Sequence, residues 1–313
     1  MRYNELPLSA QTAYAELAEQ TRVFETSSAL SGLSGSFQKL KRKGQEYWYF
    51  AFRDGDKVRM SYVGPDDERV RALIERFKQS RRKKPLAPAA QSAIALGCAP
   101  TAPKHFRIIK KLADYGFFRA GGVLVGTHAF VAYGNMLGIR WTHGSATLDV
   151  DFAHAGKNIS VALPADLKID VHGALESLEM GLLPIQGDGA GAQYLQPLKY
   201  KEFALQNTTR GCVFGNIGAC TVNLPAPERY AVHKLIVYGE RPVAERTKAK
   251  KDLLQSASLA EYFERSGQAR TFNAAWRDAL GRGPGWRKRA LEGKKALLNL
   301  FPELDKPALW KEK

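Results

Sequence analysis

The chain has 313 residues, and its 47 lysines and arginines outnumber its 31 aspartates and glutamates, which gives a formal net charge of +16 at pH 7. Hydrophobic residues make up 44% of the sequence, as in globular proteins with a real core. The longest apolar run, around residues 121–131, is too short to span a membrane, so composition excludes an integral membrane protein. The cationic surplus favours nucleotides, RNA or DNA as partners; a basic surface that only aids solubility is the alternative.

The N-terminal 20 residues include three glutamates and lack the apolar core of a secretory signal, so we expect a cytoplasmic protein. The three cysteines, Cys98, Cys212 and Cys220, are odd in number and widely spaced. This pattern predicts reduced thiols and no structural zinc.

The first region, residues 1–100, is predicted to combine helices with a small basic sheet. A helical pattern covers residues 9–24, and a second helix with an acidic first turn covers residues 65–80. Between them, turn residues separate three predicted strands at 36–41, 47–53 and 57–63. The basic run at 81–84 marks a linker.

Basic and aromatic side chains share the first hairpin of this sheet: Lys39, Lys41, Arg42 and Lys43 beside Tyr47, Trp48 and Tyr49. Such a strand surface suits contacts with phosphates and stacking of bases. The alternative is a small sheet whose aromatic residues face its own core, because aromatic residues are ordinary strand formers.

The second region, residues 101–224, alternates helices with strands, which implies an α/β (α+β) fold with a mixed sheet and flanking helices. We expect helices at 104–118 and from 127, and strands at 122–125, 146–152 and 158–163. The third region, residues 225–313, is predicted to be helical, with helices at 228–237, 242–255, 259–266, 271–280 and 286–298.

A glycine joins the strand at 122–125 to the following helix. The free N–H groups at the start of that helix can bind phosphate. Gly126 would let a triphosphate approach the backbone, and Thr127 would cap the helix or donate to a phosphate. An ordinary strand-to-helix turn is the alternative.

Two acids, Asp149 and Asp151, lie two residues apart on the next predicted strand, so their side chains share one face. Carboxylates held this close repel each other, and Mg²⁺, which prefers oxygen ligands, resolves the repulsion. The alternative is a pair of exposed aspartates on a solvated sheet face.

Together these two motifs resemble the nucleotidyltransferases of the DNA polymerase beta superfamily. The 22 positions from Thr127 to Asp149 exceed the gap in the smallest members. The pattern is similar to the branch that includes abortive-infection toxins, in which an arginine and a serine or threonine precede the Asp-x-Asp. Arg140 and Thr147 take those places here.

A third motif supports this resemblance. In related families a helical lysine, a later arginine and a Lys/Arg-Asp pair hold nucleotide phosphates, and one set of residues matches that order: Lys234, Arg241, Lys250 and Asp252. A solvated basic helix face is the alternative. Residues 30–260 also resemble an uncharacterised bacterial group of nucleotidyltransferase-fold proteins, through the segments at 35–37, 174–184 and 227–230.

Members of the superfamily carry a third carboxylate on a later strand, and we expect it between residues 184 and 198. That stretch is rich in glycine and lacks a strand pattern. Asp170 has the apolar flanks of the missing acid, although it also suits a helix N-cap, and Asp188 lies on a predicted loop.

The resemblance implies transfer of NMP from an NTP to an acceptor hydroxyl, with two Mg²⁺ ions held by Asp149 and Asp151 and Asp170 as a further catalytic acid. The charge makes RNA, such as a tRNA end, the first expected acceptor; a protein hydroxyl is the second. Two other interpretations stay open. One is a nucleotide- or nucleic-acid-binding module without turnover, and the other is a toxin-like module neutralised by an antitoxin-like protein partner.

Overall fold

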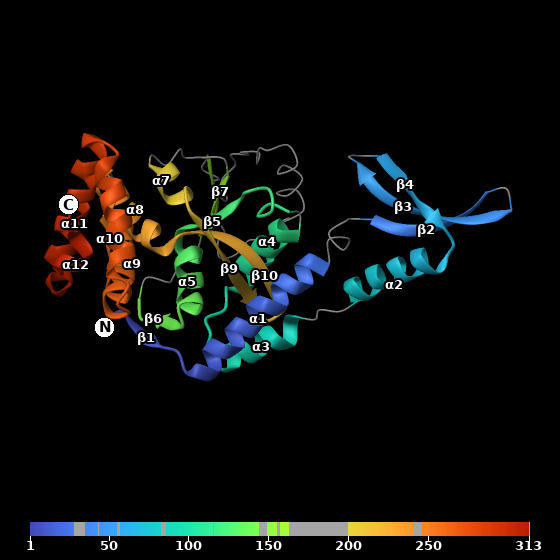
Figure 1. Ribbon diagram of the computed structural model, residues 1–313, viewed down its shortest axis with the longest axis horizontal. Helices are drawn as coiled ribbons and strands as arrows, with labels where there is room; N and C mark the ends of the chain where they lie inside the picture. Colours follow the sequence, from blue (N-terminus) through green and yellow to red (C-terminus); the bar gives the residue numbers. More distant parts are fainter. Residues whose placement is uncertain are drawn as a thin grey trace.

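Helices and short antiparallel sheets make up the chain, so the α+β class predicted from the sequence is confirmed (Figure 1). The computed structural model describes residues 1–27, 35–42, 44–54, 57–82, 86–114, 116–143, 149–154, 157–162, 200–240 and 246–312. The strands are β1 (Tyr3–Glu5), β2 (Gly35–Arg42), β3 (Gln45–Asp54), β4 (Lys57–Pro65), β5 (Val123–Val125), β6 (Ile139–Trp141), β7 (Asp149–His154), β8 (Lys157–Ala162), β9 (Thr208–Gly215) and β10 (Gly218–Pro225). The helices are α1 (Leu8–Ser27), α2 (Glu68–Arg82), α3 (Leu86–Ala95), α4 (Pro103–Asp114), α5 (Gly126–Met136), α7 (Lys201–Leu205), α8 (Pro227–Glu240), α9 (Arg246–Arg265), α10 (Ala269–Gly281), α11 (Pro284–Leu300), the 3₁₀ turn η2 (Pro302–Leu304) and α12 (Pro307–Trp310).

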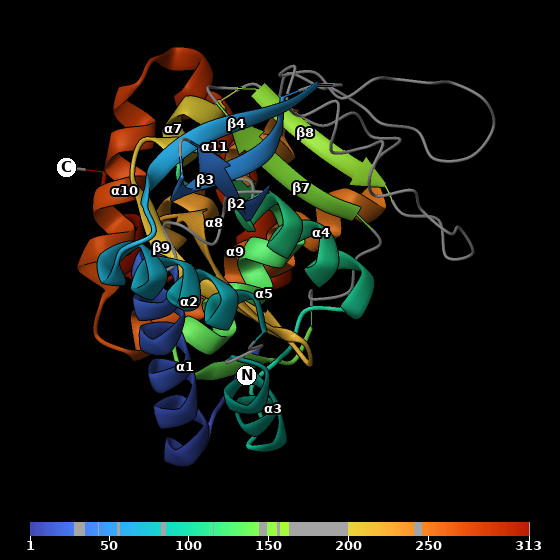
Figure 2. The same ribbon diagram turned by 90° about the vertical axis from the view of Figure 1, so that its right-hand side faces the viewer.

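Strand β7 forms the middle of the sheet that leads to the candidate site. It pairs antiparallel with β5 on one side and with β8 on the other, and Figure 2 shows β7 and β8 side by side. Val150 and Phe152 of β7 are fully buried, because alternate residues of a strand point to one face and this face meets the core. The intervening Asp151 is half-buried.

The hairpin of β9 and β10 was not predicted from the sequence. Five consecutive residues of β9, from Gly211 to Gly215, are buried, so the strand lacks the alternation that reveals a half-exposed strand. The hairpin lies against both β5 and the α1–α3 pair. Asn223 of β10 fixes the turn before β5 by donating to the carbonyl oxygens of Phe118 at 2.6 Å and Gly122 at 2.9 Å.

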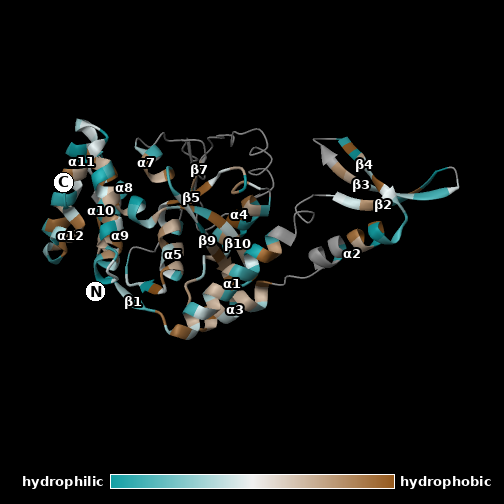
Figure 3. Cartoon of the chain, viewed as in Figure 1, coloured by the Kyte–Doolittle hydropathy of each residue, from teal (hydrophilic) through white to brown (hydrophobic). Residues whose placement is uncertain are grey.

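Two of the elements within residues 1–100 pack on this hairpin. Leu17 of α1 and Ala90 of α3 are fully buried in one cluster with Phe214 of β9. Figure 3 shows α3 and α5 largely in the colours of apolar residues. In contrast, the β2–β3–β4 sheet and α2 project away from the body that contains β5 and β7 (Figure 1). The predicted boundary at residue 100 stays a prediction.

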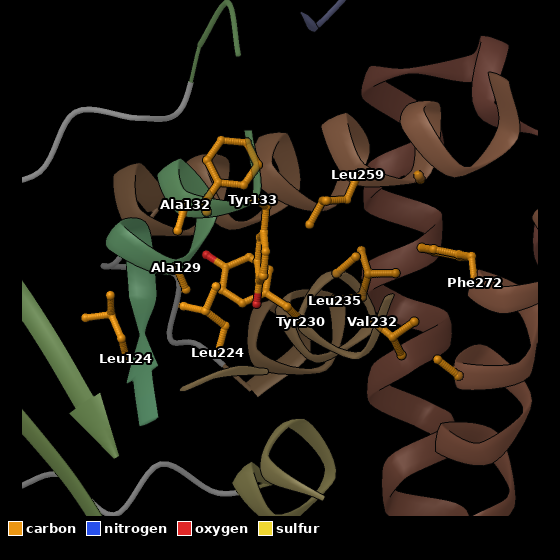
Figure 4. Packing of buried hydrophobic residues seen from close by; sticks show 14 of the residues in the cluster. Leu124, Ala129, Ala132, Tyr133, Leu224, Tyr230, Val232, Leu235, Leu259 and Phe272 are labelled. Carbon is orange, nitrogen blue, oxygen red and sulfur yellow. The ribbon is translucent and has the colours of Figure 1, made fainter. Parts of the chain in front are cut away.

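Helices α8 to α11 form the other side of the main core. The two helices predicted at 242–255 and 259–266 are one uninterrupted helix, α9. Figure 4 shows Leu235 of α8, Leu259 of α9 and Phe272 of α10 within one packed cluster. Ion pairs connect the N-terminus to this side of the core: Arg2 donates to Glu261 of α9 at 2.6 Å and also to Glu303. Among the described helices, none has the length and apolar character needed to cross a membrane.

Helix α8 crosses α11 at two glycines. A Cβ added at Gly293 would lie 2.3 Å from the carbonyl oxygen of Leu235, and one added at Gly239 would lie 2.8 Å from that of Arg289. These distances are shorter than van der Waals contact, so the backbones of the two helices touch only because both residues lack side chains.

We therefore predict that Gly293→Ala lowers the free energy of unfolding by about 2 kcal/mol, because α11 must move away from α8. The matched control is Gly281→Ala at the end of α10, where an added Cβ meets nothing within 4 Å. The control should be neutral or stabilise by up to ~1 kcal/mol. Urea unfolding of both variants checks the pair, and equal unfolding midpoints would contradict the close crossing.

Candidate nucleotide site

The turn between β5 and α5 contains a glycine that no other residue can replace without strain. Gly126 has a φ of +62°, in the left-handed region that favours glycine. A Cβ added there would lie 2.1 Å from Oδ2 of Asp151. Sequence reasoning assigned both residues to one site, and the structure brings the carboxylate against the first residue of α5.

The register of β5 and β7 produces this contact, because Val125 is paired with Asp151 and Gly126 is the next residue. Asp149 lies two residues earlier on β7, where its backbone is paired with Ala162 of β8. The side chain of Asp149 is outside the described part of the chain.

Tyr230 of α8 connects the Gly126 turn to the helical region. Its hydroxyl lies 2.9 Å from the carbonyl oxygen of Gly126 and 2.8 Å from the side-chain amide oxygen of Gln255 on α9. Burial, followed by the nearby charges of Asp252 and Asp151, raises the pKa of Tyr230 well above its usual value. The hydroxyl therefore keeps its proton at physiological pH and can donate a hydrogen bond.

The ring of Tyr230 packs edge-on against Tyr133 of α5, with centroids 5.3 Å apart, and Figure 4 shows both rings within the core. The Tyr133 hydroxyl donates to the carbonyl oxygen of Pro225 at 2.7 Å. Three elements are thus held together at one end of the site, namely α5, α8 and the end of β10.

Lys234 lies one helical turn after Tyr230 and pairs with Asp252 of α9, with 2.6 Å between Nζ and Oδ1. The lysine side chain is 15% exposed and that of the aspartate 4%, so water screens this pair only weakly. The ammonium also lies 5.2 Å from the centre of the Tyr230 ring. Sequence reasoning named both members of the pair, and the structure brings them together beside Tyr230.

Two buried histidines meet near the start of α5, where His128 lies in the first turn of that helix and His105 on α4. Nε2 of His128 is 3.0 Å from Nδ1 of His105 on α4. Burial, with smaller contributions from His105 and Lys251, lowers the pKa of His128 to about 3, so its imidazole is neutral at physiological pH. Sequence reasoning missed this pair, because a single histidine in each of two helices carries no spacing signal.

The structure places Arg140 away from Gly126. Arg140 on β6 follows the far end of α5, about 16 Å along the helix from Gly126, and donates to the carbonyl oxygen of Gly97 at 2.7 Å. Thr127 follows Gly126 directly in α5 and is buried, and Lys250 is exposed on α9. The remaining predicted residues lie outside the described residues: Thr147, Asp170, Asp188 and Arg241.

The profile of a protein family described as nucleotidyltransferase matches residues 104–196 and 183–281. Together the two matches cover residues 104–281, which is more than half of the chain. The chain belongs to this family of nucleotidyltransferases. The match includes β5, β7, α8 and α9, the elements that carry Gly126, Asp151, Lys234 and Asp252.

A second profile, described as a domain of unknown function, matches residues 14–72, from α1 to the start of α2. No curated protein and no solved structure matches the chain. Family membership confirms the prediction of a nucleotidyltransferase. The likeness to the abortive-infection branch stays a prediction.

The contact between Gly126 and Asp151 yields a test of the site's construction. Gly126→Ala should destabilise the nucleotidyltransferase by about 2 kcal/mol or more, because it adds a carboxylate collision to the ~1 kcal/mol cost of positive φ. Gly121→Ala is the matched control, since Gly121 has a φ of +92° and an added Cβ there meets nothing within 4 Å.

Thermal unfolding and isothermal titration with Mg·ATP check both variants. The control should lose only the positive-φ contribution to stability and keep its nucleotide affinity. Equal effects of the two substitutions would show that the Asp151 carboxylate does not constrain the turn.

Proposed function

We propose that this nucleotidyltransferase moves a nucleoside monophosphate from an NTP to an acceptor hydroxyl with the help of Mg²⁺. The observation that supports this most is the Asp151 carboxylate against Gly126 at the start of α5, within the family match. The unpaired N–H groups at a helix start attract phosphate, and the adjacent carboxylate suits a cation that accompanies the phosphate.

The donor chemistry of this corner fits magnesium, because carboxylate oxygen is the ligand type that this ion prefers. We assign the metal to Asp149 and Asp151 on β7. Within the described part of the chain, no group of three acidic, histidine or cysteine side chains gathers to hold a metal ion, so further ligands would come from elsewhere, including the phosphates. When bound, two ions would polarise the phosphoryl oxygens and offset the charge that develops on them.

The residues of the chain would bind and orient the triphosphate around this corner. Gly126 leaves room for the phosphates beside the backbone, and Thr127 offers a hydroxyl at the start of α5. Lys234, held in place by Asp252, would balance the phosphate charge. Further phosphate contacts are proposed for three residues selected from the sequence: Thr147, Arg241 and Lys250. Arg140 is left out, because its side chain donates to the carbonyl oxygen of Gly97 beyond the far end of α5.

Asp170 is our proposed third carboxylate, which would accept the proton of the attacking hydroxyl. This role acts in the transition state, so Asp170 should matter for turnover more than for NTP binding. RNA is the proposed acceptor, because the net charge of +16 favours a polyanion.

The decisive experiment incubates the protein with each α-³²P-labelled NTP, Mg²⁺ and total RNA, and separates protein from RNA products. We expect label in RNA, with release of pyrophosphate. The double variant Asp149→Asn/Asp151→Asn should give no product and no Mg²⁺-dependent NTP binding while it keeps the wild-type circular dichroism spectrum. Unchanged Mg·NTP binding by a folded double variant would contradict the metal assignment. Label in protein instead would contradict the acceptor.

Lys234 provides a second test of the phosphate site. Loss of a charge-assisted hydrogen bond costs roughly 1.5–3 kcal/mol, so Lys234→Met should weaken NTP binding roughly ten- to a hundredfold and AMP binding much less. Asp252→Asn is the control, because it breaks the same ion pair but leaves the ammonium. Isothermal titration measures all three proteins, and equal losses for NTP and AMP would show that Lys234 is structural.

A further inference from the structure

The β2–β3–β4 sheet has two unlike faces, since residues paired directly across antiparallel strands point to the same side. One face is covered by α2, because a Cβ added at Gly64 would lie 2.8 Å from Val70 of that helix. Gly64 is paired with Trp48, whose indole nitrogen donates to Asp66 at 2.8 Å. The face of Trp48 is therefore the inner face of this small domain.

The opposite face gathers three tyrosines. Tyr49 is paired with Tyr62 across β3 and β4, and their ring centroids are 5.6 Å apart. The ring centroid of Tyr47 lies 6.0 Å from that of Tyr62. We call this surface the tyrosine face; its described residues are Ser36, Gln38, Leu40 and Arg42 of β2, Gln45, Tyr47, Tyr49 and Ala51 of β3, and Val58, Met60, Tyr62 and Pro65 of β4.

Solvent reaches the β4 row of this face. Val58 is 65% exposed, Met60 42% and Tyr62 58%. Large apolar side chains gathered on a surface commonly mark a binding site. Tyrosine adds a flat ring on which a base can stack and a hydroxyl that stays in water.

The two faces also differ in charge: the lysine of the inner face is paired with acids, whereas the tyrosine face carries an exposed arginine. On the inner face, Lys39 is bound to Glu46 and, at 2.6 Å, to Asp66, so its charge is neutralised. On the tyrosine face the exposed Arg42 lies 5.5 Å from the ring centre of Tyr49. The described residues of that face include no carboxylate, so its electrostatics suit a polyanion.

We propose that the tyrosine face binds single-stranded RNA, with bases stacked on Tyr49 and Tyr62 and a phosphate on Arg42. A duplex would hide its bases from these rings, whereas a single strand exposes them. The choice of RNA over DNA rests on the proposed function, in which an RNA hydroxyl is the acceptor. Stacking on this face requires no catalytic activity, so it is measured separately.

The test uses the full chain and a fluorescein-labelled oligouridine of about 12 nucleotides, with fluorescence anisotropy as the readout. Tyr62→Leu and Tyr49→Leu each keep an apolar side chain but lose the aromatic ring, and each should weaken binding roughly tenfold. Tyr62→Phe keeps the ring and should bind like the wild type. Circular dichroism verifies that each variant is folded.

Two variants with the same change of charge separate the faces. Arg42→Gln should weaken RNA binding and lower the slope of log affinity against log salt by about 0.7, as expected for one lost phosphate contact on a single strand. Lys39→Gln should leave both affinity and slope unchanged, because Lys39 is already paired on the inner face.

The proposal is overturned if the two leucine variants bind the RNA as the wild type does, or if Lys39→Gln and Arg42→Gln weaken binding equally. It is also overturned if oligodeoxyuridine binds as tightly as the RNA, or if Tyr62→Leu instead converts a dimer into a monomer in sedimentation. RNA binding at this face without transfer of label would refute the proposed function alone, whereas transfer with unaffected tyrosine variants would refute this proposal alone.

Discussion

The contact between the Asp151 carboxylate and the backbone of Gly126 is the constraint on which the rest of this site depends. It requires the register that pairs Val125 with Asp151 and a residue without a Cβ at the start of α5. Because Tyr230 reaches the carbonyl oxygen of the same glycine, the helical region is aligned on the same point. The pairing of Lys234 with Asp252, one turn along α8, then fixes a cation beside the ring of Tyr230. The contacts of β7 and of α8 with the site thus meet at the backbone of Gly126.

Sequence reasoning found the residues whose spacing carries a signal. Gly126 and Asp151 were predicted from a strand-helix turn and from alternation along a strand, and Lys234 and Asp252 from their order in the chain. Gln255 and His128 were missed, because each acts through a partner on another element and the spacing within its own helix is ordinary. The third carboxylate stays a prediction, since Asp170 lies outside the described residues.

For the N-terminal sheet, the sequence likewise could not show which face another element covers. Aromatic residues on both sides of β3 left two interpretations open, a core for the sheet itself or a surface that stacks bases. Only the position of α2 separates them, since Val70 of that helix lies against Gly64, the partner of Trp48, while Tyr49 is on the opposite face. Sequence alternation showed that β3 has two apolar faces, and packing decided which of them a helix covers. The β9–β10 hairpin was missed for a related reason, because five consecutive buried residues hide its period of two.

The ion pair between Arg2 and Glu261 has a consequence for how the protein is made. These residues are 259 positions apart, so strand β1 cannot reach its final partners on α9 until that helix has left the ribosome. Contacts of such high sequence separation slow folding, because a long loop must close before they contribute. Residues Gly126 and Asp151 are synthesised well before Tyr230, so the Gly126 turn lacks its contact with α8 until that helix is made. A chain assembled in this order completes the contacts of the Gly126 turn only after α8 and α9 have been synthesised.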